Sequence, residues 1–265
     1  MRELTLIWKG ILLWVKMLSN NTIIVAAAGS GKTTHIINET LSSGKRVAIV
    51  SYTRNNVNEI KQKFYESNKG IPANVTIVTW FTFLLNDWIR PYRNYIYNHR
   101  IEGINFVQGQ SPWGLKKSNI RYFVTREHKI NTDKIAEFGI ECNSKSGGIV
   151  LDRLKSLYEH IYIDEVQDLA GYDLELLEIL FKSSISMTLI GDYRQVTYLT
   201  NHSNKNKKYR GVNIIEKFRE WANKKMIDLQ EMKHSYRCNQ LICDFADQIY
   251  PHAPKTTSKN LINTK

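Results

Sequence analysis

The hexapeptide Gly29-Ser30-Gly31-Lys32-Thr33-Thr34 lies directly after a short apolar run, Thr22 to Val25, and opens a stretch with helical spacing. Small residues at such a turn let backbone N–H groups surround phosphate oxygens, and the N-terminus of the following helix adds its dipole. Lys32 is expected to reach the β- and γ-phosphates of a nucleotide, and the Thr33 hydroxyl to ligate Mg²⁺. The pattern predicts a phosphate-binding loop; a glycine–serine turn that happens to precede a lysine is the alternative.

One position departs from the usual spacing of such loops. That spacing has a glycine at position 26, where this chain has Ala26. The residues that we expect to hold the nucleotide in this loop are Ala28, Gly29, Ser30, Gly31, Lys32, Thr33 and Thr34.

Apolar runs alternate with amphipathic stretches along most of the chain. Strands are expected at 22–25, 46–51, 75–79, 161–163, 187–190 and 226–229. A helix is expected after each of these strands, and Pro91 stops the third one. Short continuous apolar strands that alternate with helices predict an α/β fold, with a parallel β-sheet covered by helices on both faces.

A second motif, Asp164-Glu165-Val166-Gln167-Asp168, follows the predicted strand 161–163. Acidic residues at the carboxyl end of a parallel strand lie where such sheets bind ligands. Asp164 suits a Mg²⁺ ligand through water, and Glu165 can orient or deprotonate an attacking water in the hydrolysis of a nucleoside triphosphate. Alternatively, the two acids cap the N-terminus of the helix through Leu174. The presence of a phosphate-binding loop in the same chain makes a catalytic role the better interpretation.

The stretch from about Asn86 to Tyr158 has a different composition and interrupts the α/β pattern. Between Arg90 and Lys129 the only acids are Glu102 and Glu127. Basic residues alternate there with aromatic ones, a combination that suits single-stranded nucleic acid through phosphate contacts and base stacking. A small basic subdomain whose aromatic residues form its own core is an equally good interpretation. The aromatic residues are Trp88, Tyr92, Tyr95, Tyr97, Phe106, Trp113, Tyr122 and Phe123.

The composition limits the class of protein. The 265 residues contain 42% hydrophobic and 23% charged residues, which fits a globular protein of one or two domains and argues against disorder, collagen and coiled coil. Lys and Arg number 37 and Asp and Glu 25, which leaves a net charge of +12. Such a surplus favours a polyanionic partner, nucleic acid before a membrane surface, with a solvated basic surface as the alternative.

The order of the motifs resembles that of the UvrD/Rep/PcrA-like branch of superfamily 1 DNA helicases. Besides the phosphate-binding loop and Asp164–Asp168, four further segments carry the resemblance. They are Ser51 to Asn56 with Thr79 to Thr82 (motifs Ia and Ib), Gly191 to Gln195 (motif III) and Ser235 to Arg237 (motif IV). The resemblance covers about Thr22 to Ile249 without the stretch 86–158, and it implies a RecA-like P-loop NTPase fold with a small inserted subdomain.

The resemblance also implies roles for individual residues. Tyr52, Thr53, Arg54, Thr79 and Trp80 would contact single-stranded DNA. Gln195 would link sensing of the γ-phosphate to the DNA site, Tyr236 would stack on adenine, and Arg237 would reach the γ-phosphate. Taken singly, these residues have structural alternatives: Trp80 and Phe81, for example, fit a core aromatic pair equally well.

Some features of that family are absent. Residues 1–31 contain no glutamine that could read adenine. Thr34 and His35 follow Thr33, where the family tends to have a basic residue. The sequence therefore does not indicate a preference for ATP over other nucleoside triphosphates. After Arg237 the chain has one more predicted helix and a polar tail from Pro254 to Lys265, which we expect to be disordered. We therefore expect this chain to lack the second RecA-like domain of the family.

We therefore expect five segments. They are an N-terminal amphipathic extension (1–21), a RecA-like domain in two parts (22–85 and 160–234), an inserted basic and aromatic subdomain (86–159), and a last segment (235–265) with the motif IV helix and the tail. In the extension, Leu4 to Leu18 has helical spacing but is too short to span a bilayer, and Met17 is an alternative start.

The sequence thus predicts the ATP- and Mg²⁺-binding motor domain of a cytoplasmic DNA helicase or translocase, a hydrolase that binds single-stranded DNA or a duplex junction. A protein partner or a second RecA-like domain would act in trans. The alternative is a nucleotide-dependent switch subunit, for instance of a nuclease complex, that binds DNA or protein without unwinding. A small-molecule kinase fits less well because of the Asp164–Asp168 motif, and a zinc site at His234, Cys238 and Cys243 lacks a CxxC pair.

Overall fold

The structure is a computed structural model of the chain and describes residues 20–109, 111, 114–196, 200, 203–251 and 253–260. The predicted amphipathic stretch from Leu4 to Leu18, and Trp113 of the basic stretch, lie outside the described residues. Within these ranges no helix combines the length and the apolar character that a membrane crossing requires. Asn21, placed by the sequence in the N-terminal extension, is the first residue of a central strand.

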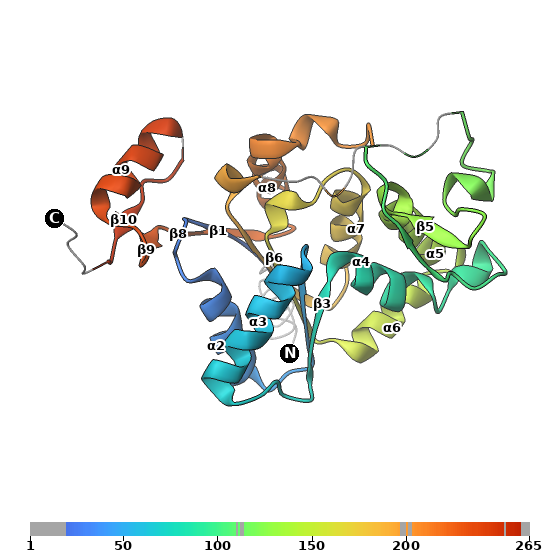
Figure 1. Ribbon diagram of the computed structural model, residues 1–265, viewed down its shortest axis with the longest axis horizontal. Helices are drawn as coiled ribbons and strands as arrows, with labels where there is room; N and C mark the ends of the chain where they lie inside the picture. The colour runs from blue at the N-terminus through green and yellow to red at the C-terminus, as the bar shows by residue number, and fades with distance from the viewer. Residues whose placement is uncertain are drawn as a thin grey trace, which may run out of the picture.

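A central sheet of six parallel strands organises the chain, in the spatial order β3-β2-β6-β7-β1-β8 (Figure 1). The sequence predicted all six strands, and the α/β fold with a parallel sheet is confirmed. The predicted strand 226–229 is wrong in its bounds, because the strand begins at Asp228 and ends at Met232. The strands are β1 (Asn21–Ala26), β2 (Val47–Ser51), β3 (Val75–Thr79), β6 (His160–Asp164), β7 (Ser186–Gly191) and β8 (Asp228–Met232).

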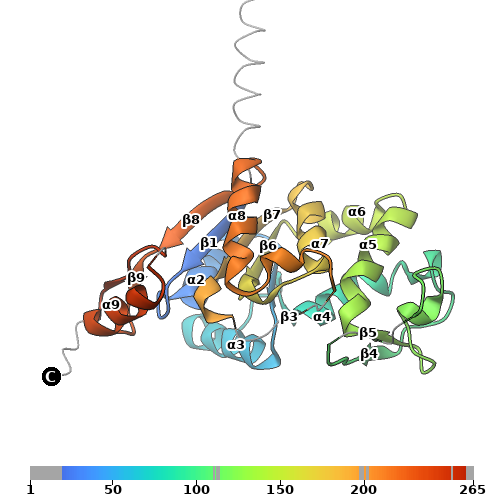
Figure 2. The ribbon, with the colours of Figure 1, turned by 90° about the horizontal axis from the view of Figure 1, so that it is seen from above.

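Helices cover both faces of the sheet because consecutive residues of its strands, which point to opposite faces, are apolar. Ile24 and Ala26 of β1 pack in one cluster with α2 and α3, whereas Ile23 and Val25 pack in a second cluster on the opposite face. Figure 2 shows α2 and α3 on one side of the sheet and α8 on the other. The helices are α2 (Lys32–Ser43), α3 (Arg54–Asn68), α4 (Trp80–Phe83), α5 (Ile135–Lys145), α6 (Ile149–Leu157), α7 (Tyr172–Phe181), α8 (Ile214–Asn223) and α9 (Gln240–Ile249).

The basic and aromatic stretch folds as a small unit of short elements beside α5 and α6. A π-helix over Leu84–Ile89 leads into it, so the predicted boundary at residue 86 falls inside a helix. A two-stranded parallel sheet, β4 (Gly103–Asn105) with β5 (Lys129–Asn131), lies at its far end. Its apolar side chains share the second cluster with Ile23 and Val25, so this unit packs on the sheet's own core.

The aromatic residues of this unit differ in exposure, and Tyr92 and Tyr122 are half-buried against the core. Trp88, Tyr97 and Phe123 are buried in the core, as the structural interpretation of the stretch predicted. Tyr95 and Phe106 are 49% and 72% exposed, so these two rings are accessible to a ligand.

The C-terminal segment is ordered up to residue 260, and the predicted disorder of the tail is wrong for residues 254–260. Thr257–Ser258 form strand β10, which pairs in parallel with β9 (His234–Ser235). The Thr256 N–H donates to Asp247 of α9 at 2.7 Å. The segment folds because its backbone N–H groups find acceptors on β9 and α9, which the polar composition does not reveal.

Trp80 is buried, and its indole N–H donates to Asp173 at 2.8 Å. The prediction that Trp80 contacts DNA is therefore wrong for this conformation, because the ring is 1% exposed and lies in the core. Asp173 also accepts a hydrogen bond from Thr200, whose hydroxyl accepts the Ala170 N–H at 3.0 Å. Burial raises the pKa of the Asp173 carboxyl to about 6, although the bonds from Thr200 and Trp80 oppose the shift.

The raised pKa of Asp173 gives a prediction for the pH dependence of stability. Since the folded pKa of about 6 exceeds the ordinary value of 3.8, the contribution of this group to stability is lost as pH rises through 6. Asp173→Asn keeps the shape and an acceptor for Trp80 but cannot ionise. We expect the free energy of unfolding of the variant, relative to the parent protein, to rise by on the order of 1 kcal/mol between pH 5 and pH 8 in urea titrations.

The control is Asp152→Asn on α6, where the side chain is 70% exposed. This variant should follow the parent protein at every pH. Parallel stability curves for Asp173→Asn and the parent protein would show that Asp173 does not titrate between the two pH values.

Candidate nucleotide-binding site

The loop between β1 and α2 has the backbone of a phosphate-binding turn. Gly29 and Gly31 have φ of +70° and +82°, in the left-handed region that favours glycine, and Gly31 caps the N-terminus of α2. The first N–H groups of α2 lack intrahelical acceptors and point toward the loop, as at any helix N-terminus. Ala26, where a glycine is usual, is the last residue of β1 and pairs with Met232, so a strand conformation suits it.

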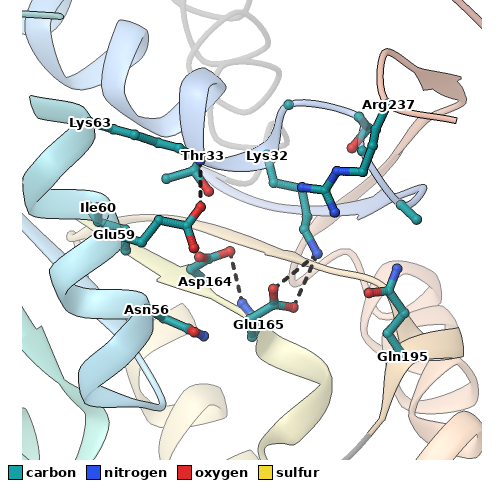
Figure 3. A pocket seen from close by; sticks show the side chains of 14 residues that line it. Lys32, Thr33, Asn56, Glu59, Ile60, Lys63, Asp164, Glu165, Gln195 and Arg237 are labelled. Atoms are coloured by element: carbon teal, nitrogen blue, oxygen red, sulfur yellow. Dashed lines mark hydrogen bonds and ion pairs between the residues drawn. The ribbon is translucent and has the colours of Figure 1, made fainter. Parts of the chain in front are cut away.

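Lys32 forms an ion pair with Glu165 across this loop. Its Nζ lies 3.2 Å from both carboxylate oxygens, and Figure 3 shows the two side chains pointing toward each other. The two residues lie 133 positions apart in the sequence, and β1 and β6 bring them to the same edge of the sheet. The loop and the acidic motif therefore belong to one site.

The acidic motif turns sharply after β6. Asp164 ends the strand and is buried, and Glu165 has φ +57° and ψ +47°, a left-handed conformation that is rare for a residue with a side chain. Helix α7 begins at Tyr172 and is capped by Gly171, so the acidic pair does not cap that helix. Burial and the Glu165 charge raise the pKa of Asp164, and the same two causes raise the pKa of Asp168 to about 7. A cation would stabilise the ionised form of this cluster.

A cavity of about 230 Å³ collects most of the predicted nucleotide residues (Figure 3). The structure places Gln195 and Arg237 at its wall opposite α3, and Gln195 donates to Asp192 at 2.9 Å. The predicted residues among its lining are Ala28, Gly29, Ser30, Gly31, Lys32, Thr33, Asp164, Glu165, Gln195 and Arg237.

Two predicted residues lie outside this cavity. Thr34 is exposed on α2 and does not line it. Tyr236 is also absent from the lining, and its ring is 63% exposed, while its backbone N–H donates to the Gly29 carbonyl at 2.9 Å.

Helix α3 supplies lining residues that the sequence analysis missed. Asn56, Glu59 and Lys63 face the loop, and Lys63 pairs with Glu59 at 2.7 Å. The intervals between these residues are three, four and seven positions, which place them on one face of the helix. This periodicity is visible in the sequence, but it points to the site only when α3 is known to lie beside the loop.

A wider groove borders the cavity on the other side of Glu165. It measures about 690 Å³, and its lining residues are Tyr52, Thr53, Asn55, Asn56, Glu165, Gln167, Asp168 and Gln195. Tyr52 contacts Phe81, with ring centroids 5.7 Å apart, and Phe81 contacts the exposed ring of Phe106 at 6.3 Å. Of the residues predicted to contact DNA, Tyr52 and Thr53 line this groove. Arg54, the next residue in the chain, is exposed. The Thr79 hydroxyl is hydrogen-bonded to the Thr82 hydroxyl.

The parallel sheet, the glycine turn at the N-terminus of α2 and the acidic strand end together define a P-loop nucleotide-binding fold. A family model described as an AAA domain, AAA_19, matches residues 14–201, and the chain belongs to this family. No curated protein matches the chain. Within the described residues, no group of three or more His, Cys, Asp or Glu side chains is arranged to hold a metal ion without other donors.

The solved structures that are similar to the chain include two of one helicase. One is a complex of Arterivirus nonstructural protein 10 (helicase) with DNA, at 13% sequence identity and a TM-score of 0.43, which covers 92% of this chain and 44% of that chain. The other is the same helicase, at 14% identity and a TM-score of 0.42, which covers 91% and 43%. The chain thus spans less than half the length of these helicases.

The contact between the loop and the C-terminal segment gives a second prediction. A Cβ atom at Gly29 would lie 2.4 Å from Arg237 Cβ, whereas a Cβ at Gly31 would meet nothing within 4 Å. Both glycines have positive φ, so alanine at either position strains the backbone by about 1–2 kcal/mol. We expect only Gly29→Ala to separate β9 from the loop as well, raising the hydrogen-exchange rate of the Tyr236 N–H about tenfold, the equivalent of about 1.4 kcal/mol.

Gly31→Ala is the matched control for backbone strain. Equal exchange rates of the Tyr236 N–H in the two variants would contradict a specific contact between Gly29 and Arg237.

Proposed function

We propose that this chain is the ATP-binding motor domain of a UvrD-like DNA helicase or translocase, and that it couples ATP hydrolysis to the binding of single-stranded DNA. The observation that supports the proposal most is the single cavity that joins Lys32 and Thr33 with Asp164, Glu165 and Arg237. Phosphate-binding, metal-binding, water-activating and charge-stabilising groups are the set that phosphoryl transfer to water requires.

The side chains fit a magnesium nucleotide. The Ser30 hydroxyl is buried at the turn of the loop, and none of the described residues bonds it. Thr33 and Asp164 line the same cavity, and burial and the Glu165 charge raise the pKa of the Asp164 carboxyl, so that a cation there would favour its ionised form. A hydroxyl and a carboxylate are oxygen ligands of the type that Mg²⁺ takes beside a nucleotide.

In the proposed mechanism, the phosphates compete with Glu165 for Lys32. The Lys32 ammonium group leaves Glu165 and pairs with the phosphate oxygens. The Glu165 carboxylate is then available to accept a proton from water. Mg²⁺, when bound by Thr33 and Asp164, would neutralise phosphate charge. Arg237 would stabilise the charge that develops on the γ-phosphate, and Gln195 would contact the same group.

The groove beside Glu165 is the proposed site for single-stranded DNA. Tyr52, Phe81 and Phe106 form an aromatic row next to it, and flat rings bind bases of any sequence by stacking. The net charge of +12 favours phosphate binding. Because the groove and the cavity share Glu165, Gln195 and Asn56, DNA in the groove would contact residues that also face the nucleotide.

Two further parts of the proposal concern partners. A second RecA-like domain or a partner protein acting in trans would complete the ATP site, as the resemblance to UvrD-like helicases implies. A nucleotide-dependent switch without turnover is the alternative, and the Lys32–Glu165 ion pair is compatible with it, since a switch also needs a contact that phosphate breaks.

Hydrolysis is tested first with Glu165→Gln. Removing the proton acceptor should lower the ATPase rate at least about 100-fold while the affinity for Mg²⁺–ATP stays within about threefold. Turnover is measured with and without single-stranded DNA, and affinity is measured by calorimetry. The matched control is Glu159→Gln at the opposite end of β6, where the carboxylate pairs with Arg46.

The outcomes separate the two functions. DNA-stimulated turnover by the parent protein that is lost in Glu165→Gln supports the motor domain. Binding of ATP without any turnover identifies the switch, and turnover retained by Glu165→Gln excludes Glu165 as the base.

DNA binding is tested with Phe106→Ala. Loss of one stacking ring should weaken the affinity for a labelled oligothymidine about tenfold, measured by fluorescence anisotropy, because stacking contributes about 1–3 kcal/mol per base. Tyr65→Ala on the far end of α3, where the ring is 58% exposed, should leave the affinity unchanged. Equal effects of the two substitutions would place the DNA away from the groove.

A further inference from the structure

Gln167 joins the loops that follow the neighbouring strands β6 and β7. Its side-chain Nε2 donates to Glu165 Oε2 at 2.6 Å, and its Oε1 accepts the Asp192 backbone N–H at 3.1 Å. Gln167 is 3% exposed, so both bonds lie largely out of contact with bulk water. One amide therefore connects the carboxylate of Glu165 to the loop of Gln195.

Asp192 extends the connection to the residues around it. Its carboxylate accepts from Gln195 at 2.9 Å and from the Arg194 guanidinium at 2.8 Å. The loop that Gln167 holds is thus the one that carries Gln195, which the proposed function assigns to the γ-phosphate.

Among the described residues, the Glu165 carboxylate has two partners, Lys32 and Gln167, and a nucleotide would remove one of them. Lys32 is the residue that phosphate attracts, whereas Gln167 does not line the nucleotide cavity. After phosphate takes Lys32, the bond from Gln167 is the contact that stays on Glu165. This bond would then hold the direction of the Glu165 carboxylate.

Gly191 leaves the space that Gln167 occupies. A Cβ atom at this position would lie 2.1 Å from Gln167 Oε1 and 3.0 Å from Val166 Cγ1. Gly191 is the last residue of β7 and does not have positive φ, so its backbone would accept alanine. The close approach of the Gln167 amide is therefore the reason for glycine here.

We propose that Gln167 is a positioning residue for the hydrolytic reaction. Its amide holds the Glu165 carboxylate in place when Lys32 binds phosphate, and it fixes Glu165 relative to Gln195. This inference rests on the proposed function, because it assigns a role to a residue of the same site.

Gln167→Glu tests the donor half of the amide. The carboxylate can still accept the Asp192 N–H, but it cannot donate to Glu165 and it adds a like charge beside it. We expect kcat to fall about 10- to 100-fold, KM for ATP to change less than about threefold, and the acid limb of the pH–rate profile to move up by about one unit. A merely structural defect would not move the pH profile.

Gly191→Ala tests the position of the amide without changing its chemistry. The new methyl group displaces Gln167, so kcat should fall as in Gln167→Glu while the pH profile stays in place. Gly139→Ala on α5 is the control, since a Cβ there would lie 3.7 Å or more from its neighbours, and it should keep the parent kcat. Unchanged kcat in both Gln167→Glu and Gly191→Ala would overturn the proposal.

A measurement that needs no turnover completes the test. In NMR spectra with Mg²⁺ and a non-hydrolysable ATP analogue, the Gln167 side-chain amide should exchange slowly with water and shift on Glu165→Gln substitution. An amide that exchanges freely in the nucleotide complex would overturn the proposal. Absence of turnover in the parent protein would instead count against the proposed function alone, because the amide signal still reports the contact.

Discussion

The site depends on the parallel pairing of β7 between β1 and β6. The register aligns Val25 with Gly191 and Asp164 with Ile190, so the three strands end at the same edge of the sheet. The phosphate-binding loop, the acidic motif and the Asp192 loop each begin where one of these strands ends. A one-residue shift of any strand would exchange the side chains that face the two helical layers and move its functional residue to the other side of the sheet. The strand pairing that sets the register therefore also sets the geometry of the cavity.

The other essential contact comes from outside the sheet. The Ser235 hydroxyl donates to the Ala28 carbonyl at 2.8 Å, and the Tyr236 N–H donates to Gly29 at 2.9 Å, which brings Arg237 into the cavity. The same segment is fixed to the Asp192 loop, since Tyr250 donates to the Arg194 carbonyl at 3.2 Å. The phosphate-binding loop thus lies between the sheet and the C-terminal segment. A displacement of either one would therefore change the shape of the nucleotide cavity.

The sequence predicts those elements and residues that belong to a short pattern or motif along the chain. The strands and the helices appear as apolar runs and helical faces, and the loop, Asp164 and Glu165 appear as motifs at strand ends, so the sheet alone brings them together. The burial of Trp80 was not predictable, because its partner Asp173 lies 93 residues away and the same aromatic residue suits a core and a nucleic-acid contact. Gln167 was part of a recognised motif, but its role depends on the space at Gly191, which only the three-dimensional structure reveals. The order of residues 254–260 depends on backbone pairing with β9, which composition does not report.

The most direct test of the account is a crystal structure of the chain with Mg²⁺ and a non-hydrolysable ATP analogue. The account predicts that the triphosphate occupies the cavity enclosed by residues 28–33, and that Lys32 has left Glu165 for the phosphates while Arg237 faces the γ-phosphate. A nucleotide bound elsewhere, or an intact Lys32–Glu165 ion pair beside bound phosphate, would contradict it.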